Sequence, residues 1–369
     1  MRSAKTRDNA GSRRSSRTRR TAGGLAGSLD RDRWTPRQRF RQTGKVKLFA
    51  RKPSAASEID PSWGDEEARK LRDQLGRGKW QEAHSALEAT SGSWDDRQFL
   101  VEVLTDDVPG RPKWIDEWTQ AHPSSSVAWT VRGAHGIKWG WEARGGGKAE
   151  SVQDQSWQLF WQRLEQAEQD LRKAAELDPA DPVPWTYLVI SARGLERGVP
   201  EIGERLKQAH ARRPWHHFAF SQALQGFAKK WGGTHELMFD LARQVQSGAP
   251  DGASAHTVVA EAHVERWLYM ASWDKDEASA LSYFRTQPVP DEIRQAAERC
   301  IWSDHYERPR LAPFDQNFFT YCFFRMHDWE HARRGLETMN GILNRFPWSY
   351  GGNPVEVFKT ARERILKGN

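Results

Sequence analysis

Residues 164–188 read LEQAEQDLRKAAELDPADPVPWTYL, and this stretch decides the expected fold. Ala167, Leu171 and Ala174 recur at intervals of three and four residues, which places them on one face of a helix. A turn that contains prolines follows, and a second helix is expected around Trp185. Because such a helix pair cannot bury its apolar face alone, neighbouring pairs should stack on it and form an α-solenoid.

The same helical spacing continues over the rest of the chain from about Pro61. The expected helices cover residues 65–75, 79–87, 94–103, 114–121, 127–141, 152–177, 182–193, 202–212, 215–229, 236–245, 254–271, 277–284, a segment that begins at 328, and 354–366. Trp129 and Gly133 combine a bulky residue with a small one that lets a partner helix approach. We therefore predict an all-α domain over residues 61–369, with a candidate break near 144–152, where three glycines interrupt the pattern.

The composition fits an elongated helical array better than one large compact core, because the apolar fraction of the 369 residues is only 37%. The chain holds 19 tryptophans, so we expect a core rich in tryptophan. Cys300 and Cys322 are too few for a disulfide framework and are expected to be reduced core residues. No stretch approaches the ~18 to 20 consecutive apolar residues of a membrane span, which predicts a cytoplasmic protein without a membrane partner.

The positive charge of the chain is concentrated in its first residues. Residues 1–56 hold 17 of the 56 Lys and Arg residues but only three of the 49 acidic ones, so this segment carries a net charge of +14. The remainder of the chain is acidic, with a net charge of −7. Because residues 1–60 contain little that could pack in a core, we predict that they form a disordered basic tail.

Residues 160–193 resemble the tetratricopeptide repeat, in which helix pairs of about 34 residues carry a Trp, a Leu, two Ala and a late Pro at set positions. Partial matches to this pattern are Trp129 with Gly133, Trp80 with Ala83 and Leu87, and Trp329 with Ala332 and Leu336. The resemblance implies a TPR-like α-solenoid of stacked helical hairpins. The amphipathic segment 354–366 would then be the closing helix that keeps such a solenoid soluble.

A second resemblance rests on the turn Lys230-Trp231-Gly232-Gly233-Thr234. Over residues 129–250 the chain is similar to an uncharacterised group of bacterial helical proteins that carry a Lys-Trp-Gly-Gly-Ser/Thr turn, a group that implies no known activity. The two glycines can adopt positive φ and end the helix that begins at Trp215, and Thr234 can cap the next helix. Besides this structural role, the amides of residues 233–236 beside the Trp231 indole could form a small site for an anion or another ligand.

Three groups of histidines are candidate metal ligands. His327, Glu330 and His331 match the H-x-x-E-H pattern of inverted zinc proteases. Trp329 and Ala332 are already expected in the repeat core, so helix-surface histidines are the favoured interpretation. The neighbours His216 and His217 should point to different sides of a helix and cannot bind one ion together, and the pair His256 and His263 has no cysteine nearby. We expect no metal, no cofactor and no enzymatic activity.

The solenoid suggests that the protein is a non-enzymatic scaffold, which binds a protein or peptide partner in the groove of its helical repeats. The residues expected to line this groove are Trp129, Arg132, Trp185, Tyr187, Lys230 and Trp231.

The alternative is a nucleic-acid-binding protein that acts through its basic tail. Arginines could neutralise phosphates there, and the affinity would then fall steeply with salt. The residues expected to make these contacts are Arg13, Arg14, Arg17, Arg19, Arg20, Arg37 and Arg39.

Overall fold

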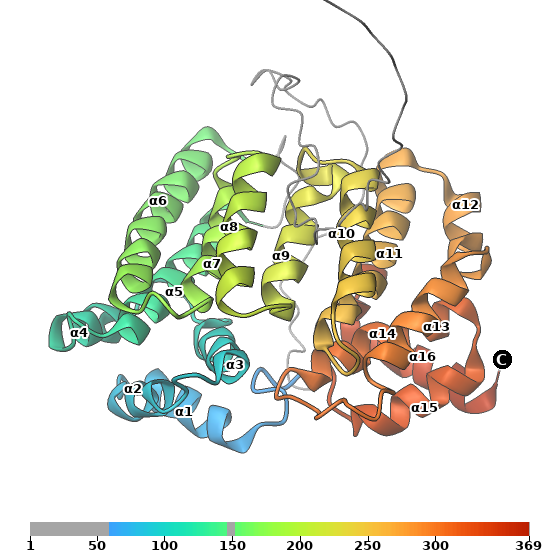
Figure 1. The fold of residues 1–369 in the computed structure, drawn as a ribbon, viewed down its shortest axis with the longest axis horizontal. Coiled ribbons are helices and arrows are strands. Elements are labelled where there is room, and N and C mark those ends of the chain that lie inside the picture. Colours follow the sequence, from blue (N-terminus) through green and yellow to red (C-terminus); the bar gives the residue numbers. More distant parts are fainter. Residues whose placement is uncertain (1–58, 146–151, 369) are drawn as a thin grey trace, which may run out of the picture. The chain divides into compact units, whose positions relative to one another are not determined.

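The computed structural model describes residues 59–145 and 152–368, and within these ranges the chain forms helices and turns but no β-strand (Figure 1). Residues 1–58 of the predicted tail, which include the seven arginines named above for nucleic-acid binding, and residues 146–151 of the predicted break lie outside the described residues.

The α-helices are α1 (Glu66–Gly76), α2 (Gln81–Glu88), α3 (Trp94–Thr105), α4 (Lys113–Ala121), α5 (Ser126–Arg144), α6 (Asp154–Leu177), α7 (Val183–Gly194), α8 (Val199–Arg212), α9 (His217–Phe227), α10 (His235–Gly248), α11 (Thr257–Tyr269), α12 (Glu277–Ser282), α13 (Val289–Arg299), α14 (Ala312–Met326), α15 (Trp329–Met339) and α16 (Pro354–Lys367). Shorter helical turns are η3 (Lys229–Trp231), η4 (Ser254–His256), η5 (Met270–Asp274), η6 (Tyr283–Arg285) and η7 (Trp348–Gly351).

The prediction of an all-helical fold is confirmed for the described residues, and most expected helices agree with the structure to within a few residues. Several begin at the polar residue expected to cap them: Asp65 accepts a hydrogen bond from the Ala68 amide at 2.8 Å, and Thr234 accepts one from the Leu237 amide at 3.1 Å. Two helices, α13 and α14, were not predicted.

The central helices form two interleaved rows. α6 lies against α5 and α7, α8 against α7 and α9, and α10 against α9 and α11. The odd-numbered helices also contact one another directly, from α3 through α5, α7 and α9 to α11. α7 and α11 are buried on almost all sides, whereas α8 and α10 bury one face, which is the difference expected between central and peripheral helices.

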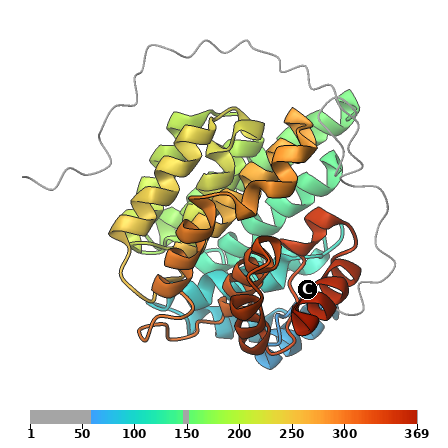
Figure 2. The same ribbon diagram turned by 90° about the vertical axis from the view of Figure 1, so that its right-hand side faces the viewer.

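The C-terminal helices return to the beginning of the described chain (Figure 2). α14 packs on α11, and residues on both sides of α14 reach N-terminal elements. Arg310 forms an ion pair with Asp65 at 2.8 Å, and Arg345 forms one with Asp107 at 2.7 Å. The C-terminal segment therefore packs against the N-terminal helices as well as against its neighbours in the sequence.

The prediction of a tryptophan-rich core is confirmed in part. Trp114, Trp118, Trp267 and Trp348 are buried members of the two hydrophobic clusters. Nine further tryptophans are partly buried and pack against these clusters: Trp63, Trp80, Trp141, Trp157, Trp185, Trp215, Trp273, Trp302 and Trp329. Small and aliphatic side chains with phenylalanines fill most of the remaining space. The expectation for Cys300 and Cys322 is confirmed, since both are free and buried.

The most extensive helix contact is that of α5 with α6, and glycines on α5 permit it. A Cβ atom on Gly133 would lie 2.6 Å from Leu171, and one on Gly136 would lie 3.0 Å from Ala167. The predicted role of Gly133 as the small residue at a helix contact is confirmed. α5 ends before residues 146–151 and α6 begins after them, so this contact holds together the parts of the chain on either side of that segment.

We predict that Gly133→Ala lowers the free energy of unfolding by about 1–2 kcal/mol, because the added methyl overpacks the contact with Leu171 by more than the helix propensity of alanine gains. Gly76→Ala is the matched control, since a Cβ atom there meets nothing within 4 Å and the change should be neutral or stabilising by up to about 1 kcal/mol. Urea denaturation of both variants measures the difference. Equal stability of Gly133→Ala and the unchanged protein would contradict this view of the contact.

Candidate binding site

Four indoles form a cluster where the end of α5, the start of α6 and η3 meet. We call Trp141, Trp157, Trp161 and Trp231 the indole cluster. The ring centroids of Trp231 and Trp141 lie 5.6 Å apart at nearly a right angle, and those of Trp157 and Trp161 lie 5.4 Å apart and stacked. Phe160 connects the two pairs, at 4.8 Å from Trp141 and 5.7 Å from Trp157. The four indoles therefore form one connected aromatic cluster, joined through the fully buried Phe160.

Glycines position the cluster. A Cβ atom on Gly194, at the end of α7, would lie 2.5 Å from Leu164 and 3.5 Å from the Trp141 ring, so glycine lets α7 end against α6 and Trp141. In the turn after Trp231, Gly232 has φ +91° as predicted, whereas Gly233 is needed because a Cβ atom would clash with the Phe227 carbonyl. α9 ends at Phe227, before the glycines, and η3 carries Trp231 as a separate turn.

Arg193 of α7 lies between two of these indoles. Its guanidinium carbon is 5.9 Å from the Trp141 ring centroid and 5.5 Å from that of Trp231. Nη1 donates a long hydrogen bond of 3.4 Å to the Gln222 carbonyl, and the buried Nε has no acceptor. Burial lowers the pKa of Arg193 to about 10, and the charge of Glu265 only partly offsets this effect. The guanidinium is therefore short of negative charge.

Glu265 of α11 is the nearby carboxylate, but other groups already use it. Lys230 approaches its Oε2 to 2.6 Å. Gln225 and the Tyr350 hydroxyl donate to its Oε1 at 2.9 and 3.2 Å. The Lys230 and Glu265 charges offset each other, so Glu265 is not available to pair directly with Arg193.

Glu265 is one end of a polar contact between α9 and α11, which we call the polar ladder. His217 Nε2 lies 3.0 Å from Glu261, and the Ser221 hydroxyl donates to the same carboxylate at 2.5 Å. Gln225 to Glu265 is the next step of the ladder. His217, Ser221 and Gln225 are four residues apart, as are the two glutamates, so one face of each helix meets the other.

The C-terminal elements cover the polar ladder. His217 Nδ1 lies 3.4 Å from Asp315 at the start of α14, and Tyr350 of η7 reaches Glu265. Burial opposes the charge of His217, but the hydrogen bond with Glu261 and the charges of Asp315 and Glu261 outweigh it and raise the pKa. Both carboxylates are almost inaccessible. The face that an open groove would present here is filled by the chain itself.

The residues predicted to line one groove do not come together. Trp129 lies in the first turn of α5 and Trp231 contacts Trp141 near its end, twelve residues or roughly 18 Å further along the helix. Arg132 stacks on Trp129 and pairs with Asp170 at 2.9 Å.

Two predicted residues on α7 have different surroundings. Trp185 is partly accessible under Arg212, with 4.9 Å between the guanidinium carbon and the ring centroid. Tyr187 was expected in the groove, and this is wrong: its side chain is fully buried and its hydroxyl donates to Glu102 at 2.8 Å. On a helix that is buried on nearly all sides, an aromatic residue faces the core. Lys230 and Trp231 are thus the predicted residues that belong to the site.

The histidine motif does not form a metal site. His327, with φ +58°, is the cap residue after α14, and Asp328 is the cap residue before α15, so His327 and His331 do not share a helix. As predicted, His216 and His217 point apart, to Asp95 at 2.7 Å and to Glu261. Among residues 59–145 and 152–368, no group of three or more His, Cys, Asp or Glu side chains could hold a metal ion.

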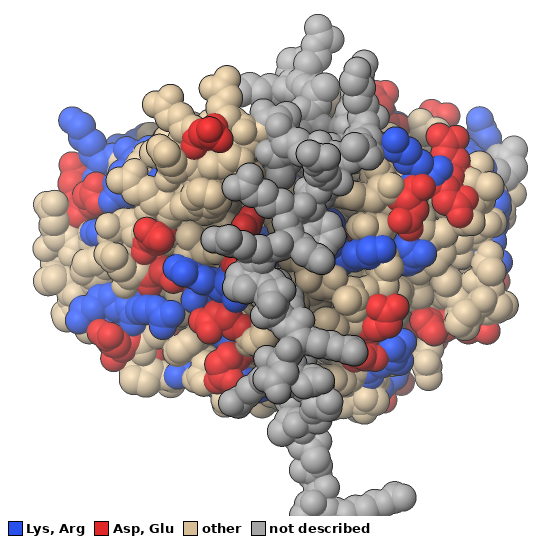
Figure 3. Space-filling model, turned by 90° about the horizontal axis from the view of Figure 1, so that it is seen from above, with Lys and Arg blue, Asp and Glu red and all other residues tan. Residues whose placement is uncertain are grey.

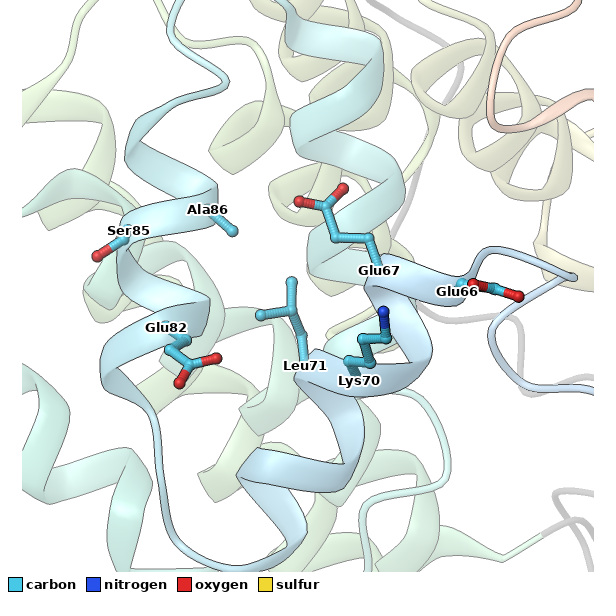
Figure 4. Close-up of a pocket in the computed structure, with 7 residues that line it drawn as sticks. All are labelled: Glu66, Glu67, Lys70, Leu71, Glu82, Ser85 and Ala86. Atoms are coloured by element: carbon cyan, nitrogen blue, oxygen red, sulfur yellow. The ribbon is translucent and has the colours of Figure 1, made fainter.

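Apart from the indole cluster, the structure has a groove between α1 and α2 with a volume of about 610 Å³ (Figure 4). It is lined by Glu66, Glu67, Lys70, Leu71, Glu82, Ser85 and Ala86. Its charged side chains are exposed to solvent, and Glu67 is already paired with Arg310 at 3.2 Å. The groove therefore has no desolvated group that would bind or activate a ligand.

The sequence did not identify Arg193, Trp141, Trp157 or Trp161 as site residues. Trp157 and Trp161 are four residues apart, and each is followed by a glutamine, a signal that could have marked an accessible indole pair. No local sequence pattern identifies Arg193, because its lack of a paired carboxylate depends on how three helices pack together.

Neither a protein-family model nor a curated protein sequence matches the chain.

Within the described ranges, no helix has both the length and the apolar character that crossing a membrane requires. On the face drawn in Figure 3, Lys and Arg side chains are interspersed with Asp and Glu, so the visible described surface has no broad field of one sign. The function therefore has to be inferred from the site itself.

We predict that Asp315→Asn lowers the pKa of His217, because one of its two anionic neighbours is removed. With a raised pKa, the ionic contacts of His217 stabilise the fold fully below about pH 6.5, the unfolded value, and are lost as pH rises through the folded value. In the variant this loss should begin at a lower pH. NMR titration of labelled histidines gives the pKa directly.

Asp251→Asn is the control, since Asp251 is an exposed residue that pairs with Arg299. It should leave the His217 titration unchanged. An unaltered His217 pKa in Asp315→Asn would show that the two side chains are not coupled.

Proposed function

We propose that this is a non-enzymatic interaction protein of the cytoplasm, which binds a protein or peptide partner at the indole cluster. The helical body is the scaffold. The interleaving of α5 to α11 supports a TPR-like stacking of hairpins, in which each pair covers the next. The binding surface lies at the end of these helices, because C-terminal elements cover the face between α9 and α11.

The observation that carries the proposal is the exposure of a large apolar side chain at the cluster. Trp161 is 38% exposed, on a helix whose other apolar residues are, except for Leu159, largely in contact with the body. Tryptophan and arginine are the residues that most often dominate the binding energy of protein interfaces. The cluster supplies both, since Arg193 and Arg144 lie over its rings. A partner that covered Trp161 would remove its exposed apolar area from water.

The first test uses the full chain as bait to isolate a partner, followed by calorimetry with the purified partner. We predict that Trp161→Ala weakens binding by about 30-fold, or ~2 kcal/mol, because the exposed indole is lost from the centre of the contact. Leu281→Ala is the matched control: Leu281 is 70% exposed on α12, away from the cluster, and its loss should not change the affinity. If both variants bind as the unchanged protein does, the cluster is not the interface.

The second candidate function, nucleic-acid binding through the tail, is favoured by the net charge of +14 in residues 1–56. For this function, replacing Arg13, Arg14, Arg17, Arg19 and Arg20 by Gln in the full chain should abolish salt-sensitive binding to DNA or RNA in a filter-binding assay. The protein partner should bind this variant with unchanged affinity. Loss of partner binding with the tail substitutions, but not with Trp161→Ala, would favour the tail as the functional element.

A further inference from the structure

We propose that Arg193 binds a carboxylate of the partner, an Asp or Glu side chain within a peptide segment whose apolar neighbours lie on the indole cluster. This inference rests on the proposed function and specifies the chemistry of its ligand. The guanidinium between Trp141 and Trp231 is the anchor, and Trp231 is the side chain that has to tilt to admit the carboxylate.

The hydrogen bonds of Arg193 leave one edge of its guanidinium open. Nη1 donates to the Gln222 carbonyl, whereas neither Nε nor Nη2 has an acceptor among the described residues. Nε and Nη2 are the two donors of one edge, and a carboxylate can accept from both in parallel. A buried donor without an acceptor is costly, so a ligand that supplies one is bound favourably.

Other buried arginines in this body show what Arg193 lacks. Arg97 pairs with Asp181 at 2.7 Å and Arg205 pairs with Glu201 at 2.8 Å. No carboxylate of the described residues lies within 4.0 Å of Arg193, although Glu265 is near enough to influence its charge. Lys230 holds Glu265 at 2.6 Å instead. The missing counter-charge is the feature that a partner would supply.

The position of Trp231 is compatible with movement. It lies in the three-residue turn η3, outside α9 and α10, and is followed by Gly232 with φ +91°. Its ring contacts Trp141 edge-on and is partly accessible. A tilt of this side chain opens Nε without displacing a helix. Binding should therefore change the surroundings of both indoles.

A peptide fits the site better than the other anionic or internal occupants. The chain's own tail is basic and has the same sign as Arg193. A nucleic acid would need an extended positive field, but the remainder of the chain carries a net charge of −7. The Arg193 guanidinium, whose carbon lies 5.9 Å from the Trp141 ring centroid and 5.5 Å from that of Trp231, matches one carboxylate next to apolar side chains.

The test uses ¹⁹F NMR of the full chain labelled with 5-fluorotryptophan, with the Trp141 and Trp231 resonances assigned through Trp→Phe variants. The probes are acetyl-Leu-Asp-Phe-amide and its neutral isostere acetyl-Leu-Asn-Phe-amide. Inorganic phosphate and a twelve-residue oligothymidylate are added separately. We expect the Asp peptide to shift both resonances in a saturable way, and the Asn peptide to bind at least tenfold more weakly.

Arg193→Gln should abolish the preference for the Asp peptide, and Arg193→Lys, which keeps the charge but not the two-donor edge, should retain part of it. Arg212→Gln is the matched control, because Arg212 also stacks on an accessible indole, that of Trp185, and should bind like the unchanged protein. Unchanged circular dichroism of each variant excludes unfolding as the cause.

Three results would overturn the inference: no saturable shift with the Asp peptide, equal binding of the Asp and Asn peptides, or tighter binding of phosphate or oligothymidylate than of the Asp peptide. Its failure can be distinguished from failure of the proposed function. If Trp161→Ala weakens the isolated partner and Arg193→Gln does not, the indole cluster is the interface but Arg193 is not its anchor. If neither variant has an effect, both proposals fail.

Discussion

The contact between α9 and α11 through buried charges is the constraint on which the rest of the structure depends. Glu261, Glu265 and Asp315 are nearly inaccessible, and a buried carboxylate is tolerated only when it is paired and hydrogen-bonded. His217 supplies the cation for Glu261 and Asp315, so α9, α11 and α14 must meet at that point. The C-terminal segment is required for this arrangement and is not an appendage of a helical array that is complete without it.

This constraint limits where the proposed partner can bind. With Asp315 and Tyr350 over the polar ladder, the face between α9 and α11 is used for folding. The accessible aromatic area lies where α5, α6 and η3 meet, at the end of the ladder marked by Glu265. The abundance of tryptophan serves both parts of this division, because most indoles are in or against the hydrophobic clusters and several of the partly accessible ones also stack on arginines.

Apolar spacing was sufficient to predict most helices, their caps at Asp65 and Thr234, and the glycine contact at Gly133, because each depends on residues close in sequence. α14 was missed because it is buried on nearly all sides and has no polar face to alternate with an apolar one. The polar ladder and its cover could not be predicted, since His217 and Asp315 lie far apart in the chain. The residues predicted to line the groove do not come together for the same reason. They were predicted from residue type alone, whereas helix packing buries Tyr187 in the core.

Lys230 links the folding constraint to the proposed site. Glu265 could serve either Lys230 or Arg193, and the direct 2.6 Å contact goes to Lys230, which the short turn η3 brings to α11. Because one carboxylate cannot fully neutralise two cations, the guanidinium is left with two indoles and one backbone carbonyl. The turn that presents Trp231 is thus also the turn whose lysine occupies Glu265. The residue proposed to move on binding, Trp231, and the residue that holds Glu265 away from Arg193, Lys230, are neighbours in the chain, so the proposed binding requires a change in η3 only.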